Sequence, residues 1–163
     1  TANLHFARDA TSGEQMRKTD MTALLESVVH DMMDAGLPVT LAQAPPIVSA
    51  CQPGALRRVL ANLLDNAIKY GGAARAAIRL AERDIEIVID DDGPGIPADE
   101  RERVFEPFYR LDRARSEATG GSGLGLAIAR SIVHAHGGRI VFTNRTNGGG
   151  RVMLAFPCRA DST

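Results

Sequence analysis

Two asparagines and a lysine recur at helical spacing in segment 62–70, which is otherwise rich in leucine and alanine. At about 100° per residue, Asn62, Asn66 and Lys69 fall on one face of the expected helix, opposite an apolar stripe. Amide oxygens suit a hard cation, and an ammonium group suits a phosphate. The alternative is a solvated face, although asparagine is a poorer helix former than the residues such faces favour. The segment is therefore a candidate for binding a cation and a phosphate together.

Three adjacent aspartates at positions 90–92 follow an alternating apolar segment and precede Gly93 and Gly95. Three adjacent carboxylates repel one another, so the arrangement indicates a role that outweighs this electrostatic cost. A carboxylate at a strand end can occupy a pocket, and glycines just after it let the backbone approach a ligand closely. An ionised carboxylate only accepts hydrogen bonds, so it suits an exocyclic amine such as that of adenine. The alternative is an acidic turn whose glycines take positive φ angles.

A third motif, Gly-Gly-Ser-Gly-Leu-Gly-Leu at 120–126, leads into an apolar helical pattern. Glycines that open a helix expose its first amides, and the helix dipole favours an anion such as phosphate there. No strand precedes this motif, so it is neither a dinucleotide-binding loop nor a P-loop. Taken alone, a glycine-rich turn of this kind is a weak indication.

Between these motifs lies Phe-Glu-Pro-Phe-Tyr-Arg at 105–110, followed by Arg113 and Arg115. The phenylalanines can fix a loop to the body of the domain, and the arginines can bind phosphate with two parallel hydrogen bonds. The alternative for each arginine is an ordinary surface position.

The elements that position these motifs follow from periodicity and from helix start and stop residues. Asp20 is placed as the N-cap of a helix that Gly36 and Pro38 end, and further helices are predicted at about 53–70 and 123–136. Strands are predicted at 38–42, 46–50, 74–80, 84–90, 139–144 and 151–156. Because strands arrive in pairs, we expect an α+β two-layer sandwich. Its sheet is mixed but mostly antiparallel, with about five strands and three helices on one face.

Composition narrows the class of protein. A length of 163 residues suits one domain, and a net charge of −1 disfavours a nucleic-acid binder. Cys51 and Cys158 lack metal-ligand spacing and are interpreted as two reduced thiols. No apolar run has the length of a membrane span, and no signal peptide is visible.

In this order, the four motifs resemble the N, G1, F and G2 boxes of the histidine-kinase-type (Bergerat-type) ATP-binding fold. That superfamily also includes DNA gyrase, the heat-shock chaperone ATPases and MutL. The resemblance covers about residues 20–157, and the Phe-x-Pro-Phe box points to sensor histidine kinases. It implies a protein-histidine kinase domain that binds Mg-ATP and donates the γ-phosphate to a histidine on a dimerisation domain.

The resemblance also implies roles for individual residues. Asn66 corresponds to the magnesium ligand, with Asn62 on the same face, while Lys69 contacts phosphate and Tyr70 stacks on the base. Asp91 corresponds to the adenine-binding carboxylate. Residues 97–122 form the ATP lid, in which Arg110 is the first choice for the γ-phosphate contact. Further implied nucleotide contacts are Gly93, Gly95, Ile96, Phe108, Gly121, Ser122, Gly123, Leu124, Gly125 and Leu126.

The four histidines, His5, His30, His134 and His136, lack the sequence context of the family's phosphoacceptor. We therefore expect no self-phosphorylation by this chain. Residues 1–10 are interpreted as the remnant of a dimerisation hairpin helix, 11–19 as a linker, 20–158 as the catalytic domain and 159–163 as a tail.

The resemblance further implies two partners: the chain's own dimerisation domain in a homodimeric parent, and a cognate response regulator. We expect this segment alone to be monomeric and without a nucleic-acid partner. It would be the cytoplasmic part of a parent anchored in the bacterial inner membrane. The alternatives are a conformational ATPase, an anti-sigma-type serine kinase of the same fold, or a docking module without catalysis.

Overall fold

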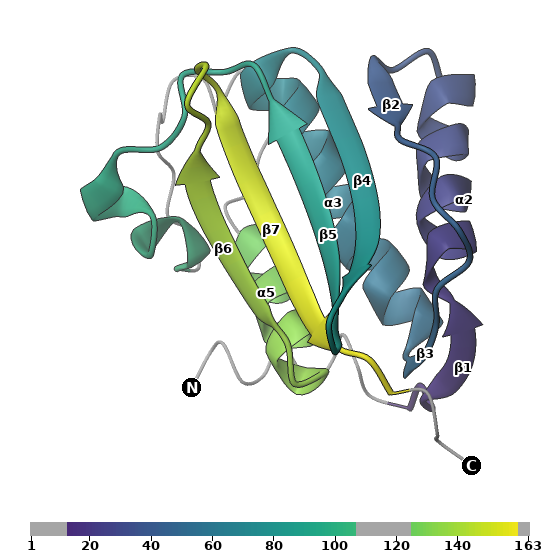
Figure 1. Cartoon of the computed structure of the whole chain (residues 1–163). Coiled ribbons are helices and arrows are strands. Elements are labelled where there is room, and N and C mark those ends of the chain that lie inside the picture. Colours follow the sequence, from purple (N-terminus) through teal and green to yellow (C-terminus); the bar gives the residue numbers. More distant parts are fainter. Residues whose placement is uncertain (1–12, 107–124, 160–163) are drawn as a thin grey trace.

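A computed structural model describes residues 13–106 and 125–159 and contains a five-stranded sheet in the order β2-β4-β5-β7-β6. All neighbours pair antiparallel except β2 and β4, which are parallel. The expected mixed, mostly antiparallel sheet of an α+β protein is confirmed (Figure 1). The strands are β2 (Val39–Leu41), β4 (Ala74–Ala81), β5 (Asp84–Asp91), β6 (Arg139–Asn144) and β7 (Gly150–Pro157).

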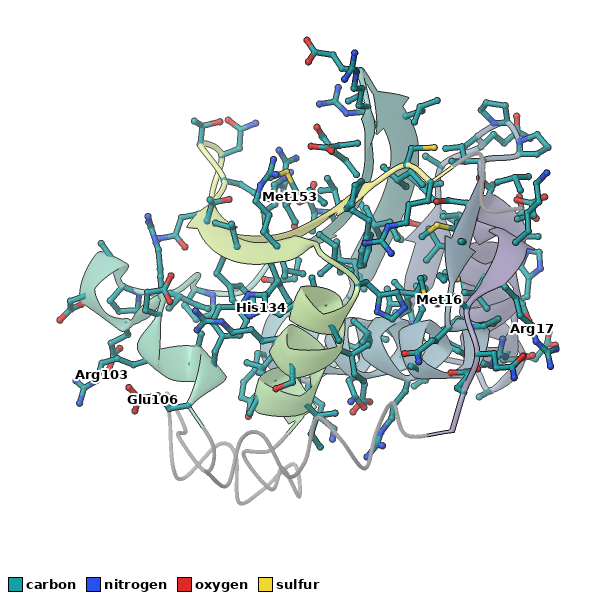
Figure 2. The ribbon with its side chains drawn as sticks, turned by 90° about the horizontal axis from the view of Figure 1, so that it is seen from below. Met16, Arg17, Arg103, Glu106, His134 and Met153 are labelled. Atoms are coloured by element: carbon teal, nitrogen blue, oxygen red, sulfur yellow. The ribbon has the colours of Figure 1, made fainter. Side chains whose placement is uncertain are left out.

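Helices α3 (Pro53–Gly71) and α5 (Gly125–Ala135) cover one face of this sheet (Figure 1). Helix α2 (Met21–Asp34) packs against α3 and β2 at the sheet edge. Two short 3-10 helices, η1 (Ala98–Glu100) and η2 (Arg103–Phe105), follow β5. No helix of the described residues lies on the opposite face of the sheet, and Met153 of β7 points to that side (Figure 2).

The helix ends lie where local chemistry places them. The carboxylate of Asp20 accepts a hydrogen bond from the Ala23 amide at 3.1 Å, which confirms the predicted N-cap of α2. Pro53 occupies the first turn of α3, where its missing N–H needs no partner. Gly72 ends α3 in the left-handed region at φ 81°.

The core lies between α3 and the centre of the sheet. Leu56, Leu60 and Leu64 of α3 are fully buried, as the helical apolar stripe predicts. Ile85, Ile87 and Ile89 of β5 are also buried, because every second residue of the strand faces the helices. Each such side chain contributes about 1.5–3 kcal/mol through removal from water.

The predicted linker 11–19 was wrong at its last three residues, 17–19. Arg17–Asp20 form strand β1, which pairs antiparallel with β3 (Val48–Cys51) in a separate two-stranded sheet. The segment is polar and does not alternate, so only pairing with a distant strand reveals it. Strands β2 and β3 likewise do not pair with each other as the predicted order of strand pairs suggested. β2 joins β4, and β3 joins β1.

Within the part of the chain that the structure describes, no helix is both long and apolar enough to cross a membrane.

Candidate functional site

Asp91 is the last residue of β5 and lies where three segments meet. Its Oδ1 atom accepts hydrogen bonds from the backbone amides of Gly93 at 2.8 Å and Gly150 at 3.2 Å. One donor comes from the loop after β5 and the other from the start of β7. The carboxylate is therefore oriented by main-chain groups on two sides.

Glycines make this meeting of segments possible. A Cβ atom at Gly71 would lie 2.5 Å from Cβ of Asp91, and one at Gly93 would lie 2.6 Å from the Tyr70 carbonyl oxygen. A Cβ atom at Gly149 would lie 2.1 Å from the Asp91 carbonyl oxygen. Any side chain at these positions would push the segments apart. We call this meeting place the Asp91 junction; it consists of Tyr70, Gly71, Asp91, Gly93, Gly149 and Gly150.

The structure thus brings together Tyr70, Asp91 and Gly93, which sequence analysis placed in one site. It adds Gly71, which directly follows the predicted helix 53–70, and Gly149 and Gly150, which lie between the predicted strands 139–144 and 151–156. The number of glycines at these two places could have indicated that the backbone comes close to another segment. One glycine is enough to end a helix, and a hairpin turn needs fewer than three.

The two neighbouring aspartates are held on the other side of the strand. Arg151 makes two hydrogen bonds to Asp90, of 2.6 and 2.9 Å, and Arg75 makes two to Asp92, both of 2.9 Å. These hydrogen bonds hold the pKa values of the Asp90 and Asp92 carboxyls below their ordinary range.

Arg145 adds a third cation. Its guanidinium lies 3.7 Å from Asp90 and 3.4 Å from Asp92, and it donates to the Asp91 carbonyl oxygen at 3.4 Å. The repulsion among adjacent carboxylates is therefore offset by three arginines, none of which sequence analysis identified. β-strand alternation turns Asp90 toward them and Asp91 toward α3.

The predicted cation and phosphate residues lie along α3. Asn62, Asn66 and Lys69 are all half-buried, and the Lys69 ammonium lies 3.0 Å from the carboxylate of Asp65 one turn earlier. Gly125, the first residue of α5, lies beside Asn62, since a Cβ atom there would be 3.9 Å from the Asn62 amide carbon. The polar face of α3 therefore meets the beginning of α5.

This donor set suits magnesium shared with a phosphate. The described residues include no group of three or more His, Cys, Asp or Glu side chains able to hold a metal ion. Amide oxygens from Asn62 and Asn66 are hard ligands, and Mg²⁺ is commonly bound by few protein groups together with substrate phosphates.

Phe105 fixes the start of the expected lid to the body of the domain. Its side chain is buried, its ring centre is 5.3 Å from that of Phe142, and the Arg130 guanidinium lies 5.0 Å over the ring. Arg103 and Glu106, before and after it, project outward (Figure 2). The predicted anchoring by a phenylalanine is confirmed for Phe105.

Two further predicted site residues, Ile96 and Leu126, are partly buried against the core. Other predicted site residues lie outside the part of the chain that the structure describes. Those outside are Phe108, Arg110, Gly121, Ser122, Gly123 and Leu124.

Comparison with known proteins decides the family. Residues 51–160 match the family model described as histidine kinase-, DNA gyrase B-, and HSP90-like ATPase. The chain belongs to this family. The match begins at Cys51 and so takes in α3, the Asp91 junction and α5. The resemblance that the four motifs carry is thereby confirmed.

Among members of this ATPase family, the chain is 39% identical over 155 residues to the sensor histidine kinase GtrS of Pseudomonas aeruginosa. That alignment covers 94% of this chain and 32% of GtrS. It is 43% identical over 103 residues to the sensor protein RstB of Escherichia coli, covering 63% of this chain and 24% of RstB. The chain therefore spans no more than about a third of these relatives.

The fold is shared with a crystal structure of the ATP-binding domain of PrrB from Mycobacterium tuberculosis. The TM-score is 0.73 at 31% sequence identity, with 89% of this chain and 98% of that chain covered. The compared structure is an excised domain of nearly the same extent, so the ATPase-family domain accounts for most of the described chain.

Proposed function

We propose that this chain is the catalytic domain of a two-component sensor kinase, which binds Mg-ATP and donates its γ-phosphate to a histidine on another domain. The observation that carries the proposal is the Asp91 junction. There a carboxylate is oriented by two backbone amides, and glycines keep the surrounding backbone close. An acceptor fixed in this way suits the exocyclic amine of adenine.

Residues along α3 would bind the magnesium ion and the phosphates. Asn66 would hold magnesium, with Asn62 nearby on the same face, and Lys69 would exchange its contact with Asp65 for a phosphate oxygen. The bound magnesium would neutralise phosphate charge during transfer. The glycines before α5 and Arg110 would act on the phosphates, while Tyr70 would pack against the base. Such a site positions the nucleotide and stabilises charge, which is most of what phosphoryl transfer requires.

The parent protein's partners follow from the same proposal. Relatives of this chain are named sensor histidine kinases, and the chain spans only part of their length. We propose a homodimeric parent anchored in the bacterial inner membrane, with this domain in the cytoplasm and a response regulator as the phosphate acceptor downstream.

Nucleotide binding is tested by titrating the chain with ATP and magnesium in a calorimeter. We expect binding by the unaltered chain and a loss of affinity of at least tenfold in Asp91→Asn. Asparagine can still accept from the Gly93 and Gly150 amides, but its NH₂ group cannot accept from an amine. Asp34→Asn, a change at the exposed last residue of α2, is the matched control and should bind as the unaltered chain does.

Phosphoryl transfer is tested with radiolabelled ATP. The chain alone should remain unlabelled, and the dimerisation hairpin of its parent, when added, should acquire acid-labile phosphate. Acid-stable phosphate would indicate a serine kinase, and phosphate release without labelling would indicate an ATPase. Absence of ATP binding would indicate a docking module.

A further inference from the structure

Asn144, the last residue of β6, makes a pair of hydrogen bonds to a single distant residue. Its Oδ1 atom accepts from the Ile96 amide at 2.9 Å, and its Nδ2 atom donates to the Ile96 carbonyl at 3.0 Å. One side-chain amide thereby satisfies both backbone groups of Ile96, as a neighbouring strand would. Ile96 is partly buried against the core, five residues after Asp91.

The residue opposite Asn144 in the β6–β7 ladder is Gly150. The Gly150 amide donates to the Asp91 carboxylate at 3.2 Å. One cross-strand pair therefore holds both ends of the loop 91–96: Gly150 holds the beginning, and Asn144 holds the end. Within this loop, the Gly93 amide closes back onto Asp91 at 2.8 Å.

Gly95 shows how closely Asn144 approaches the loop. It has φ of 76°, and a Cβ atom there would lie 2.6 Å from Oδ1 of Asn144. Two features therefore require glycine at this position: the positive φ angle of the backbone, and the close approach of the Asn144 side-chain amide.

We infer that Asn144 is a positioning residue for nucleotide binding: it fixes the Asp91–Ile96 loop in the shape that receives the base. The inference rests on the proposed function, because it concerns the affinity for ATP. Asn144 acts through Ile96 and through the loop. It therefore governs the base end of the nucleotide, and ATP and ADP should be affected equally.

The test compares Asn144→Ala with the unaltered chain by calorimetric titration of ATP and of ADP. Loss of two hydrogen bonds to the loop should weaken both nucleotides by about tenfold and leave the ratio of their Kd values unchanged. Asn147→Ala, at an exposed position in the same β6–β7 turn, is the matched control and should bind normally.

A general loss of stability is separated from positioning by a second control. Val29→Ala removes two methyl groups from a fully buried side chain of α2, so it should lower the free energy of unfolding without changing nucleotide affinity. Unfolding in urea identifies conditions in which all variants are folded. Weakened ATP binding in Asn144→Ala but not in Val29→Ala supports positioning, whereas equal weakening in both overturns it.

A double-mutant cycle with Gly95→Ala tests whether Asn144 and the loop act together. The alanine at 95 collides with the Asn144 amide, so it should cost less affinity in the Asn144→Ala background than in the unaltered chain. Additive effects of the two changes would contradict the inference.

Hydrogen exchange of the unaltered chain keeps the inference testable if Asn144→Ala does not fold. The Ile96 amide should exchange slowly in the ATP-bound chain, although it lies in an irregular loop. Exchange at the rate of an open loop would overturn the inference. ATP binding by the unaltered chain together with normal binding by Asn144→Ala would refute this inference alone. Failure of the unaltered chain to bind ATP would refute the proposed function.

Discussion

At the scale of single residues, the three adjacent aspartates have two different roles. Asp91 is oriented by backbone amides, while Asp90 and Asp92 are paired with arginines on the other face of the strand. Alternation along β5 explains the division, because consecutive side chains point to opposite faces. Paired arginines also keep negative charge from accumulating beside a site proposed for a polyphosphate.

The lowered pKa of Asp90 predicts a pH dependence of stability. Because Arg151 favours the ionised carboxylate, the pair stabilises the fold above the ordinary pKa of an aspartate. That contribution is lost as the pH falls through the lower pKa of the folded state. Arg151→Met should lower the free energy of unfolding by about 1 kcal/mol at pH 7.

Urea unfolding of both proteins from pH 7 to pH 3 measures this effect. The difference between Arg151→Met and the unaltered chain should shrink as the pH falls. A difference that stays constant over that range would show that the guanidinium acts through packing and not through Asp90.

At the scale of elements, α3 receives its N-terminal cap from a distant segment. The carboxylate of Glu14 accepts from the amides of Gly54 at 2.6 Å and Ala55 at 2.8 Å. Gln52, at the N-cap position, makes no side-chain capping bond; its side-chain amide donates to the Glu14 carbonyl at 2.7 Å. A Cβ atom at Gly54 would lie 2.8 Å from the Glu14 carboxylate, so the glycine admits the cap.

His136 ties the same helix start to the end of α5. Its Nε2 atom accepts a hydrogen bond from the backbone amide of Gln52 at 3.0 Å, and its Nδ1 atom lies 2.8 Å from the Ile132 carbonyl oxygen. Since a backbone N–H can only donate, these partners assign the proton of the neutral ring to Nδ1. The beginning of α3 is therefore held from two sides.

Removal of the Glu14 cap should destabilise the domain. Glu14→Ala leaves two helix amides without their acceptor and should lower the free energy of unfolding by about 1 kcal/mol. Glu14→Gln keeps an acceptor oxygen but loses the charge, so its effect should be smaller. Urea unfolding measures both, with Glu106→Ala at an exposed position as the control. Equal stability of all four proteins would show that the capping bonds contribute nothing in solution.

Two neighbouring glycines in the β6–β7 turn form a matched pair. Gly148 and Gly149 have φ angles of 92° and 91°, but an added Cβ meets nothing within 4 Å at Gly148 and lies 2.1 Å from the Asp91 carbonyl at Gly149. Alanine at either position carries the conformational cost, of order 1–3 kcal/mol. Only Gly149→Ala should also displace Asp91 and abolish nucleotide binding.

Thermal unfolding with and without ATP distinguishes the two variants. Gly148→Ala should be destabilised yet still gain stability from ATP through mass action, and Gly149→Ala should gain none. The same gain in both variants would contradict the role assigned to the Asp91 junction.

At the scale of the whole molecule, the segment before α2 is part of the fold. β1 pairs with β3, and Glu14 caps α3, so residues 14–20 contact residues that lie 28–41 positions further along the chain. Cys51, at the end of β3, is buried at this contact, and burial raises the pKa of its thiol.

The two cysteines therefore report the integrity of this contact. Because the thiolate is the reactive form, iodoacetamide should modify half-buried Cys158 well before Cys51 in the folded chain at pH 8. In urea, both should react at similar rates. Mass spectrometry of peptides quantifies each site, and rapid labelling of Cys51 without denaturant would show that the β1–β3 contact opens readily.

The sequence by itself determined what depends on local chemistry. The Asp20 cap, the apolar stripe of α3 and the alternation of β5 each follow from neighbouring residues, and their structures agree with the prediction. The residue types and order of the four motifs also indicated the family, because each motif needs only the residues within it.

Only the tertiary structure decided what depends on residues far apart in the chain. The pairing of β1 with β3 and the Glu14 cap cannot be seen locally, because polar residues there show no periodicity. Strand register decides the ion pairs that Arg75, Arg145 and Arg151 make with the aspartates. It also decides the hydrogen bonds between Asn144 and Ile96. Two such side chains become neighbours only when the sheet brings their strands together in the right register. The local sequence around either residue therefore does not indicate its partner.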